Sequence, residues 1–332
     1  MRRALVLSSG GAKSSWQVGA CQHLITEGGY WFDVISGVSA GAINGAALAH
    51  AHDRDGLRAH LERLRSVWLG FRGNQDIYRR RRLGALGLAL GKWNSLYDTT
   101  PLRELLAREI DPPKLAVSPI RLRVGYVDLR SGRYVTAGND HPFLLDAVMA
   151  SSSVPLVFPP IPVGGSRELG VDGAVRHATP LTDAVCALAD LPPDGDPPEV
   201  WVILLHPPRK VPATDTIRKW FGIAFRSLSF DTDEVLIQRP RGSHVIPSPS
   251  AGPVCERYPR VRVRVLHPPR ELNGSALDFR PSKIRAWYQD GLETARHTKP
   301  LELPARVEHG PGVRVGRWSG ELTFSIGPRQ AA

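Results

Sequence analysis

The sequence predicts an α/β fold with a mostly parallel central sheet, and three observations support this prediction. The chain has 332 residues, 42% hydrophobic and 23% charged, an ordinary globular composition long enough for one large or two small domains. Short apolar runs alternate with stretches of helical periodicity along most of its length. The run at residues 200–205 is almost continuously apolar, which is typical of a parallel strand buried on both faces.

The first unit is a predicted buried strand at residues 4–7, a turn rich in serine and glycine at residues 8–15, and a predicted helix at residues 16–26. Such a turn presents backbone N–H groups to an anion. A P-loop needs glycine directly before the lysine, where this chain has Ala12, and only one of the three glycines of the dinucleotide fingerprint is in place. An oxyanion hole fits the turn better than a nucleotide site, and we expect this strand to lie beside the next one.

The second unit carries Gly37-Val38-Ser39-Ala40-Gly41, a G-x-S-x-G motif between a short apolar strand and a helix of small residues. In this motif the serine sits on a strained turn, and its hydroxyl projects from the end of the sheet. Bulky side chains beside the serine would clash, and both flanking residues are glycines. The helix N-terminus favours negative charge at the serine oxygen. We interpret Ser39 as a nucleophile rather than an exposed serine at a helix start, so it needs a base and oxyanion donors.

The remaining elements follow in order. We expect helices at residues 42–51, 57–69, 101–109, 143–150, 214–228 and 282–296, and strands at residues 121–127, 134–136 and 261–266. Asp172 follows a short apolar run and precedes Gly173, which predicts a position at a strand end, where open α/β sheets place functional groups. Taken alone, the Asp-Gly pair is explained better as an ordinary turn.

A basic and apolar segment interrupts this pattern. Arg79, Arg80, Arg81 and Arg82 precede an apolar run that ends near Trp93. One interpretation is a solvated charge run beside a core helix. The other is a peripheral membrane contact, in which the arginines meet anionic headgroups and the apolar side chains enter the interface. Glycines in the apolar run weaken the amphipathic helix that a membrane contact would prefer.

Composition excludes several classes. Cys21, Cys186 and Cys255 lie far apart without a C-x-x-C pair, which argues against a disulfide framework or zinc site and fits a reducing compartment. No apolar run approaches a membrane span, and residues 4–7 are too short for a signal-peptide core. We expect a cytoplasmic protein, with peripheral attachment to the inner face of the membrane as an option. The net charge of +11 attracts nucleic acid or anionic lipid, but the arginine run lacks interleaved aromatics and any nucleic-acid motif.

Four blocks of sequence occur in a characteristic order. These blocks are the Ser-Gly-Gly-Ala-Lys turn at residues 9–13, the motif at residues 37–41, Ala-Ser-Ser-Ser-Val-Pro at residues 150–155, and Asp172-Gly173-Ala174. Taken together, they resemble the patatin-like phospholipases. Residues 96–102 are similar to a stretch common in bacterial members, and residues 290–295 look like the family's final helix. The resemblance covers about residues 1–297, which we treat as one acyl hydrolase domain. Residues 298–332 form a C-terminal tail, with a β-hairpin as an option and no assigned function.

The resemblance implies a three-layer α/β/α fold and a serine hydrolase of lipid acyl esters, of the phospholipase A or lysophospholipase type. It implies Ser39 as the nucleophile and Asp172 as its partner in a dyad. It further implies that Gly10 and Gly11 supply oxyanion N–H groups and that Lys13 takes the basic position after the glycines. We expect a phospholipid or other acyl-ester lipid as substrate, no cofactor and no metal. The oligomeric state is not predicted.

The sequence departs from the family pattern at two residues, and two alternative functions remain open. Ser9 and Ser14 stand where the family has glycine, and a serine at positive φ costs about 1 kcal/mol or more, so we expect a reshaped oxyanion turn. The first alternative is an esterase of the α/β-hydrolase type, whose catalytic histidine follows the catalytic Asp or Glu in the chain. In that fold more strands precede the serine turn than are predicted here before Ser39. Its histidine candidates are His206, His244, His267 and His297. The second alternative is a non-catalytic lipid- or protein-binding module on the same scaffold.

Overall fold

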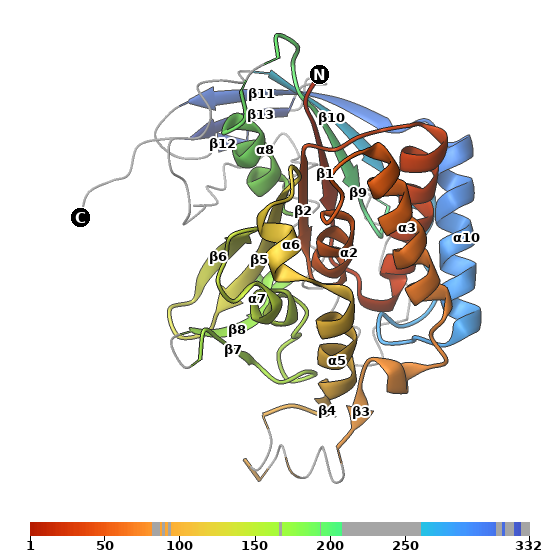
Figure 1. The fold of residues 1–332 in the computed structure, drawn as a ribbon, viewed down its shortest axis with the longest axis vertical. Helices are drawn as coiled ribbons and strands as arrows, with labels where there is room; N and C mark the ends of the chain where they lie inside the picture. The colour runs from red at the N-terminus through yellow and green to blue at the C-terminus, as the bar shows by residue number, and fades with distance from the viewer. Residues whose placement is uncertain are drawn as a thin grey trace.

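A central sheet organises the chain in the computed structural model (Figure 1). The structure describes residues 1–81, 87, 90–91, 94–165, 168–192, 194–207, 260–309, 314–315 and 322–326. The parallel part of the sheet runs in the order β10 (Arg260–Leu266), β9 (Glu199–Ile203), β1 (Arg3–Leu7), β2 (Val34–Val38) and β5 (Arg121–Asp128). The predicted neighbour relation of the first two strands is confirmed, because β1 pairs with β2 in parallel.

Antiparallel strands complete both edges of the sheet. Beyond β5 lie β6 (Arg133–Gly138), β8 (Glu168–Asp172) and β7 (Ile161–Val163), and beyond β10 lie β11 (Leu301–His309), β13 (Leu322–Ile326) and β12 (Arg314–Val315). The described residues after 297 thus continue the sheet from β10, because β11 pairs with it antiparallel. The division of the chain at residue 297 stays a prediction. A separate two-stranded sheet joins β3 (Arg79–Arg80) to β4 (Tyr97–Asp98).

Helices cover both faces of the sheet, which gives the predicted three-layer α/β/α fold. One face carries α8 (Leu181–Ala189); the other carries α1 (Ser15–Cys21), α2 (Ala40–Leu48), α3 (Arg54–Leu69), α5 (Thr100–Glu109), α6 (Pro112–Ala116), α7 (Leu144–Ser151) and α10 (Pro281–His297). Successive side chains of β1 point to opposite faces of the sheet. Leu5 and Leu7 therefore join the larger core, while Ala4 and Val6 pack with α8.

Local signals account for most of these helices. Asp53 caps α3 by accepting a hydrogen bond from the Gly56 N–H at 2.7 Å, and proline stands in the first turns of α5 and α10, where its missing N–H costs nothing. The predicted helix at residues 16–26 begins one residue earlier and continues as a π-helical turn, Gln22–Glu27. The helix expected at residues 214–228 lies outside the described residues. Among the helices that the structure describes, none is long and apolar enough to cross a membrane.

Candidate active site

The turn between β2 and α2 places Ser39 at the carboxyl end of the parallel strands. Ser39 has φ 60° and ψ −134°, a conformation that L-residues rarely adopt. A Cβ atom at Gly37 would lie 2.3 Å from the carbonyl oxygen of Gly41, and one at Gly41 would lie 2.3 Å from that of Leu7. Both flanking positions therefore require glycine, as the motif predicts.

The register of β5 brings Asp172 to Ser39. Strand β2 ends where Val38 pairs with Gly125, and β8 ends where Asp172 pairs with the next residue of β5, Tyr126. Strand β6 occupies the opposite side of β5, so β2 and β8 meet end to end on the same side. Ser39 directly follows Val38, and the two candidate catalytic residues therefore face each other across adjacent positions of β5.

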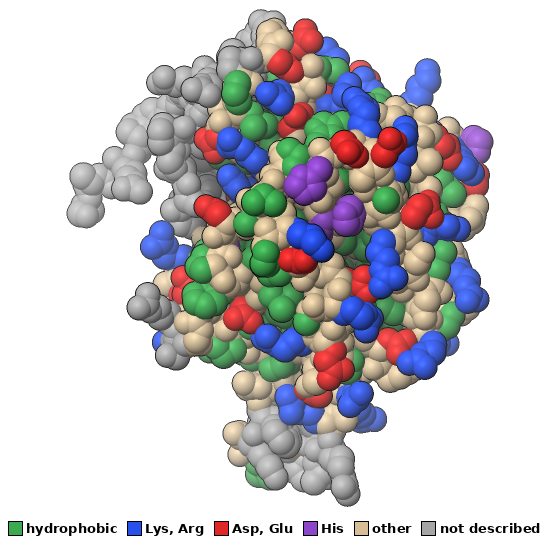
Figure 2. Space-filling view, viewed as in Figure 1, with side chains coloured by type: hydrophobic (Ala, Val, Ile, Leu, Met, Phe, Trp, Pro, Cys, Tyr) green, Lys and Arg blue, Asp and Glu red, His purple; other side chains and the backbone are tan. Residues whose placement is uncertain are grey.

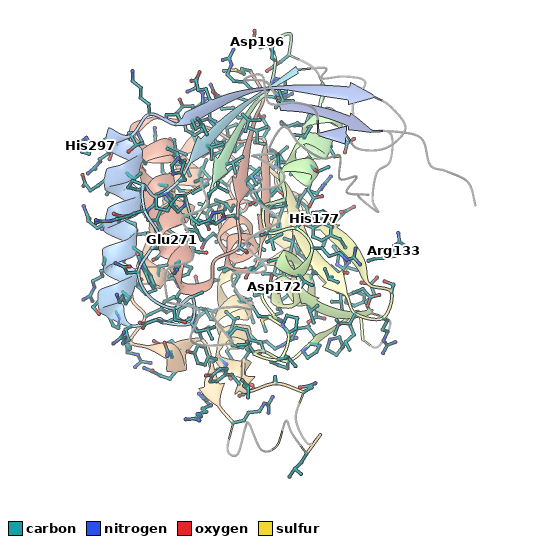
Figure 3. All side chains as sticks on the ribbon, turned by 180° about the vertical axis from the view of Figure 1, so that it is seen from behind. Arg133, Asp172, His177, Asp196, Glu271 and His297 are labelled. Carbon is teal, nitrogen blue, oxygen red and sulfur yellow. The ribbon has the colours of Figure 1, made fainter. Side chains whose placement is uncertain are left out.

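Asp172 is almost fully buried and lies beside Ser39. Its carboxylate accepts a hydrogen bond from the Ala174 N–H at 2.9 Å. Burial raises the pKa of Asp172 to about 7, while the Ala174 N–H and the Ser39 hydroxyl pull the pKa downward. Figure 3 labels Asp172 near the middle of the molecule. A carboxyl group with a pKa near 7 can accept a proton from the serine at neutral pH.

The turn after Asp172 also depends on close backbone approach. A Cβ atom at Gly173 would lie 2.4 Å from the carbonyl oxygen of Gly125. Ala174 is buried and supplies the N–H that binds the carboxylate. In the Asp-Gly-Ala sequence, Asp172 thus supplies a hydrogen-bond acceptor, Gly173 allows close backbone contact, and Ala174 supplies a hydrogen-bond donor.

Ser151 binds the backbone of Ser39, a contact that the sequence did not reveal. Its hydroxyl oxygen accepts a hydrogen bond from the Ser39 N–H at 2.9 Å, and its hydroxyl donates to the carbonyl of Gly125 at 2.6 Å. The available signal was the block at residues 150–155, which resembled the family without any function assigned to its serines. This hydrogen bond ties the strained turn to β5.

The turn at residues 9–13 packs closely against its neighbours, and its backbone requires glycine at residue 11. A Cβ atom at Gly10 would lie 2.0 Å from the Leu205 side chain, and one at Gly11, whose φ is 56°, would lie 2.3 Å from the carbonyl oxygen of Ala276. The prediction of backbone strain at Ser9 and Ser14 is wrong. Among the described non-glycine residues, only Ser39 and Leu156 have a positive φ. Ser14 is instead helical, with φ −68°.

Two buried amide side chains fix this turn relative to α2. Gln17 donates to the carbonyl of Ser8 at 2.7 Å, and Asn44 donates to the carbonyl of Ser14 at 3.2 Å and to Gln17 at 3.1 Å. Asn44 lies in α2, little more than one helical turn after Ser39. The network therefore couples the position of the glycine turn to that of the nucleophile. Sequence reasoning missed both residues, since isolated amides carry no motif.

The three predicted oxyanion residues are not equivalent in the structure. Gly11 lines the same pocket as Ser39, whereas Gly10 and Lys13 are absent from the described wall of that pocket. Burial lowers the pKa of Lys13, and the negative charge of Glu271 opposes this shift. Lys13 thus lies half-buried behind the turn.

Ser39 opens into a mostly apolar pocket of about 940 Å³, a volume that includes the part open to solvent. Its wall residues come from the glycine turn, α2, α3, α5, the segment before β7 and the segment before α10: Gly11, Ser39, Ala40, Ile43, Ala47, His60, Arg63, Leu64, Val67, Trp68, Phe71, Ile77, Leu102, Leu105, Leu106, Glu109, Ile110, Ser152, Val154, Phe158, Ala276, Leu277 and Phe279. An apolar pocket beside a serine nucleophile suits the acyl part of an ester.

The candidate histidines lie elsewhere. His206 and His267 follow β9 and β10 as predicted, and their Nδ1 atoms lie 3.3 and 2.9 Å from the next residue's carbonyl oxygen. His297 is at the outer surface on α10 (Figure 3). His244 lies outside the described residues. Only His60, which the sequence did not single out, lines the described wall of the pocket, and it does so from α3.

The expected membrane segment is described in part. Arg79 and Arg80 form β3 and are exposed, Arg81 follows half-buried, and Arg82 and Trp93 lie outside the described residues. Strand β3 begins two residues after Ile77, which lines the pocket.

Comparisons with known proteins give one family and several distant structures. The sequence matches the family model of the patatin-like phospholipases over residues 5–185. The structure is similar to VipD from Legionella pneumophila, with a TM-score of 0.43 and 14% identity, covering 91% of this chain and 68% of that one. It is also similar to ExoU of the type III secretion system of Pseudomonas aeruginosa, crystallised with SpcU, with a TM-score of 0.36 and 15% identity. There the match covers 91% of this chain and 54% of the other, so this chain spans about half the length of ExoU. No curated protein matches the sequence.

Proposed function

Because the chain belongs to the patatin-like phospholipase family, with the family model covering residues 5–185, we propose that it hydrolyses lipid acyl esters through an acyl-enzyme on Ser39. Family membership supports lipid acyl hydrolysis in general. The dyad is supported by one observation above all: the register of β5 brings the buried Asp172 beside Ser39, which lines an apolar pocket.

The proposed reaction begins with attack of the Ser39 oxygen on the ester carbonyl carbon. Asp172 takes the serine proton as the new C–O bond forms, which its raised pKa favours. The negative charge that develops on the carbonyl oxygen faces the glycine turn, where Gly11 borders the pocket. When the ester C–O bond breaks, Asp172 returns the proton to the departing alcohol and the acyl group stays on Ser39.

Hydrolysis of the acyl-enzyme reverses these roles with water in place of the alcohol. Asp172 removes a proton from water as its oxygen attacks the acyl carbon, and the proton then returns to Ser39 as the fatty acid leaves. The proposed substrate is a phospholipid or another acyl-ester lipid, and the proposed enzyme class is a carboxylic ester hydrolase.

The test compares the purified chain with Ser39→Ala, Asp172→Asn and the double variant on a short-chain soluble ester. Each single change should lower kcat by roughly 10³-fold or more, and the double variant should be hardly worse, because residues that act as one unit give non-additive losses. Ser36→Ala is the matched control: it removes a buried hydroxyl on the same strand that has no hydrogen-bond partner among the described residues. Near-normal turnover by Ser39→Ala would show that the dyad assignment is wrong.

Two alternatives give different results in the same assay. A non-catalytic binding module would show no turnover even in the unmodified chain. A histidine-dependent esterase would lose activity as deeply as Ser39→Ala when one of His177, His206, His244, His267 or His297 is replaced. We expect measurable activity in all five histidine variants.

The contact with a membrane surface is a further part of the proposal. A lipid hydrolase must reach its substrate in an interface, and the exposed arginines of β3 lie close in sequence to Ile77 on the pocket wall. We propose that anionic headgroups bind this side of the molecule.

A further inference from the structure

The pocket beside Ser39 is a channel between three helices. Helices α2 and α3 pack side by side and run in opposite directions (Figure 1). Trp68, near the end of α3, donates a hydrogen bond to Asn44 of α2 at 2.8 Å. Further along α2, the ring of His60, in the first half of α3, stacks on His50, which follows α2, with ring centroids 5.4 Å apart. The end of α2 therefore lies beside the first half of α3.

Helix α5 forms the third wall and runs in the same direction as α2. At its start, the Leu102 N–H donates to the carbonyl of Ile77 at 3.2 Å, close to the Ser39 end. At its last residue, Glu109 reaches Arg63 of α3. Between these ends the walls facing the channel are apolar and come from each helix in turn: Ala40, Ile43 and Ala47; Leu64, Val67 and Trp68; Leu102, Leu105 and Leu106.

The far end of the channel is polar and carries an ion pair. Arg63 donates from Nε and Nη2 to the two carboxylate oxygens of Glu109, both at 2.8 Å. Both residues line the pocket, and their side chains are 61% and 12% exposed, so the pair lies where the channel meets the surface. Figure 2 shows histidine and charged side chains gathered on this face between α3 and α6. An apolar channel with a reactive serine at one end and an ion pair at the other has a defined length.

We propose that this channel binds one acyl chain of the substrate and that the Arg63–Glu109 pair closes its end, which sets an upper limit on acyl length. The inference rests on the proposed function. Eight residues of α2 separate Ser39 from Ala47, which at 1.5 Å per residue is about 12 Å. Each methylene of an extended chain advances by about 1.3 Å, given C–C bonds of about 1.5 Å. The channel therefore holds about ten carbons, and a much longer chain must displace the ion pair.

The first experiment opens the end of the channel. It measures kcat/KM for p-nitrophenyl esters from butanoate to hexadecanoate and follows the ratio of hexadecanoate to octanoate. Glu109→Ala removes the buried half of the pair, and the Arg63 side chain, already largely in water, no longer covers the end. The ratio should rise at least tenfold. Exchanging the partners, in Arg63→Glu with Glu109→Arg, should return the ratio toward that of the unmodified chain.

The control for this experiment is Arg65→Ala. Arg65 lies on the same helix and pairs with Glu62 at 3.0 Å, but neither residue lines the pocket. It should leave the ratio unchanged. An unchanged ratio in Glu109→Ala, or an equal rise in Arg65→Ala, would overturn the assignment of the end.

The second experiment shortens the channel from within. Ile43 and Ala47 lie about 4.5 and 10.5 Å along α2 from Ala40. Ala47→Phe should lower the ratio of dodecanoate to butanoate at least tenfold, and Ile43→Phe should lower the ratio of octanoate to butanoate as well. Using ratios within each variant removes any general loss of activity. A length limit that does not move with the blocked position would contradict the channel.

Binding separates failure of this inference from failure of the proposed function. Ser39→Ala is titrated with dodecanoate by calorimetry, alone and with Ala47→Phe. Dodecanoate binding that Ala47→Phe weakens at least tenfold supports the channel, even if no variant hydrolyses an ester. Ester hydrolysis with the same chain-length profile in every variant and no dodecanoate binding would retain the function and overturn the channel.

Discussion

Ser39 holds a backbone conformation that is unfavourable for any residue with a Cβ atom. Its φ of 60° and ψ of −134° place it in a region that costs on the order of 1–3 kcal/mol. The surroundings hold it there, because the Ser39 N–H donates to Ser151 and the flanking Gly37 and Gly41 allow close backbone approach. The strain is what projects the hydroxyl toward Asp172 and the pocket.

This strain predicts an unusual order of stabilities. Ser39→Gly should be more stable than Ser39→Ala by about 1 kcal/mol, since glycine adopts positive φ without the steric penalty. Both variants should lose activity. Urea denaturation of the two proteins measures the difference. If Ser39→Ala is the more stable of the two, the turn is not strained as described.

As the proposed base, Asp172 makes the proposed reaction dependent on pH. Burial raises its pKa to about 7, and only the ionised form can accept the serine proton. The rate of ester hydrolysis should therefore rise with pH and level off above about 7. A pH profile of kcat/KM on a soluble ester measures this limb. A profile that is flat between pH 5 and 8 would contradict a base with this pKa.

The raised pKa of Asp172 also predicts that ionisation of this residue lowers the free energy of unfolding. Between pH 4 and 7 the folded state keeps a proton on Asp172 that the unfolded state has lost, so the free energy of unfolding falls as pH rises through this range. Three pKa units correspond to about 4 kcal/mol. Asp172→Asn keeps the shape without the charge, so it should match the unmodified chain at pH 4 and exceed its stability by up to this amount at pH 8. Urea denaturation of both proteins at pH 4 and pH 8 measures the difference in their free energies of unfolding. A difference that is the same at both pH values would contradict the prediction.

At the scale of elements, two glycines set how closely α1 and α10 cross. A Cβ atom at Gly19 of α1 would lie 2.0 Å from the carbonyl oxygen of Tyr288, and one at Gly291 of α10 would lie 2.1 Å from that of Trp16. The crossing lies near the catalytic turn in the chain, because α1 begins directly after it. The Ala12 N–H of that turn also donates to the carbonyl of Ala276, shortly before α10, at 2.7 Å.

The crossing predicts that Gly291→Ala is destabilising even though alanine favours helix by about 1 kcal/mol over glycine. The added methyl must push the helices apart, and overpacking of this kind typically costs about 1–3 kcal/mol. Because the glycine turn moves with α1, kcat should fall as well. Arg285→Ala, on the exposed side of α10, is the matched control and should change neither quantity. Thermal unfolding and turnover give both measurements, and a Gly291→Ala protein with unchanged melting temperature would refute the close crossing.

At the scale of the whole molecule, the sequence predicted the features that depend on a few neighbouring residues, and not those that depend on contacts between distant segments. The parallel strands and the turn at Ser39 were predicted because apolar runs and G-x-S-x-G act over a few residues. The meeting of Ser39 and Asp172 depends on β8 pairing with β5 just beyond β2, and only the resemblance to a family suggested it. The strain wrongly expected at Ser9 and Ser14 came from the family's glycines, and their backbone conformation depends on contacts with distant segments.

The pocket is the part that the sequence could not reveal. Its walls come from helices whose relative direction is set by packing, and two of its lining residues, Arg63 and Glu109, form an ion pair between two helices. The hydrogen bonds of Ser151 and Asn44 are likewise made between segments far apart in the chain. No periodicity or motif encodes such contacts, because each residue alone reads as an ordinary surface or core position.

Charge and pocket together favour one side of the molecule for lipid contact. The chain carries a net charge of +11, and Lys and Arg side chains are spread over the face seen in Figure 2. Two of the arginines, Arg79 and Arg80, are exposed on β3. Leu156 is 53% exposed, with φ 67°, and lies between Val154 and Phe158 of the pocket wall. An exposed leucine and exposed arginines near the pocket fit an interface of apolar chains and anionic headgroups.

This arrangement predicts reversible binding to anionic vesicles. Each basic residue near an anionic surface contributes about 1 kcal/mol, so Arg79→Ser with Arg80→Ser should weaken co-sedimentation about tenfold or more, and rising salt should weaken binding of the unmodified chain. Hydrolysis of a soluble ester should be spared. The control removes equal charge in Arg130→Ser with Arg133→Ser, at the β5–β6 turn, where Arg133 points away from the molecule (Figure 3). Equal pelleting with anionic and neutral vesicles, or equal weakening in both variants, would mean that β3 is merely solvated and that the lipid reaches Ser39 by another side.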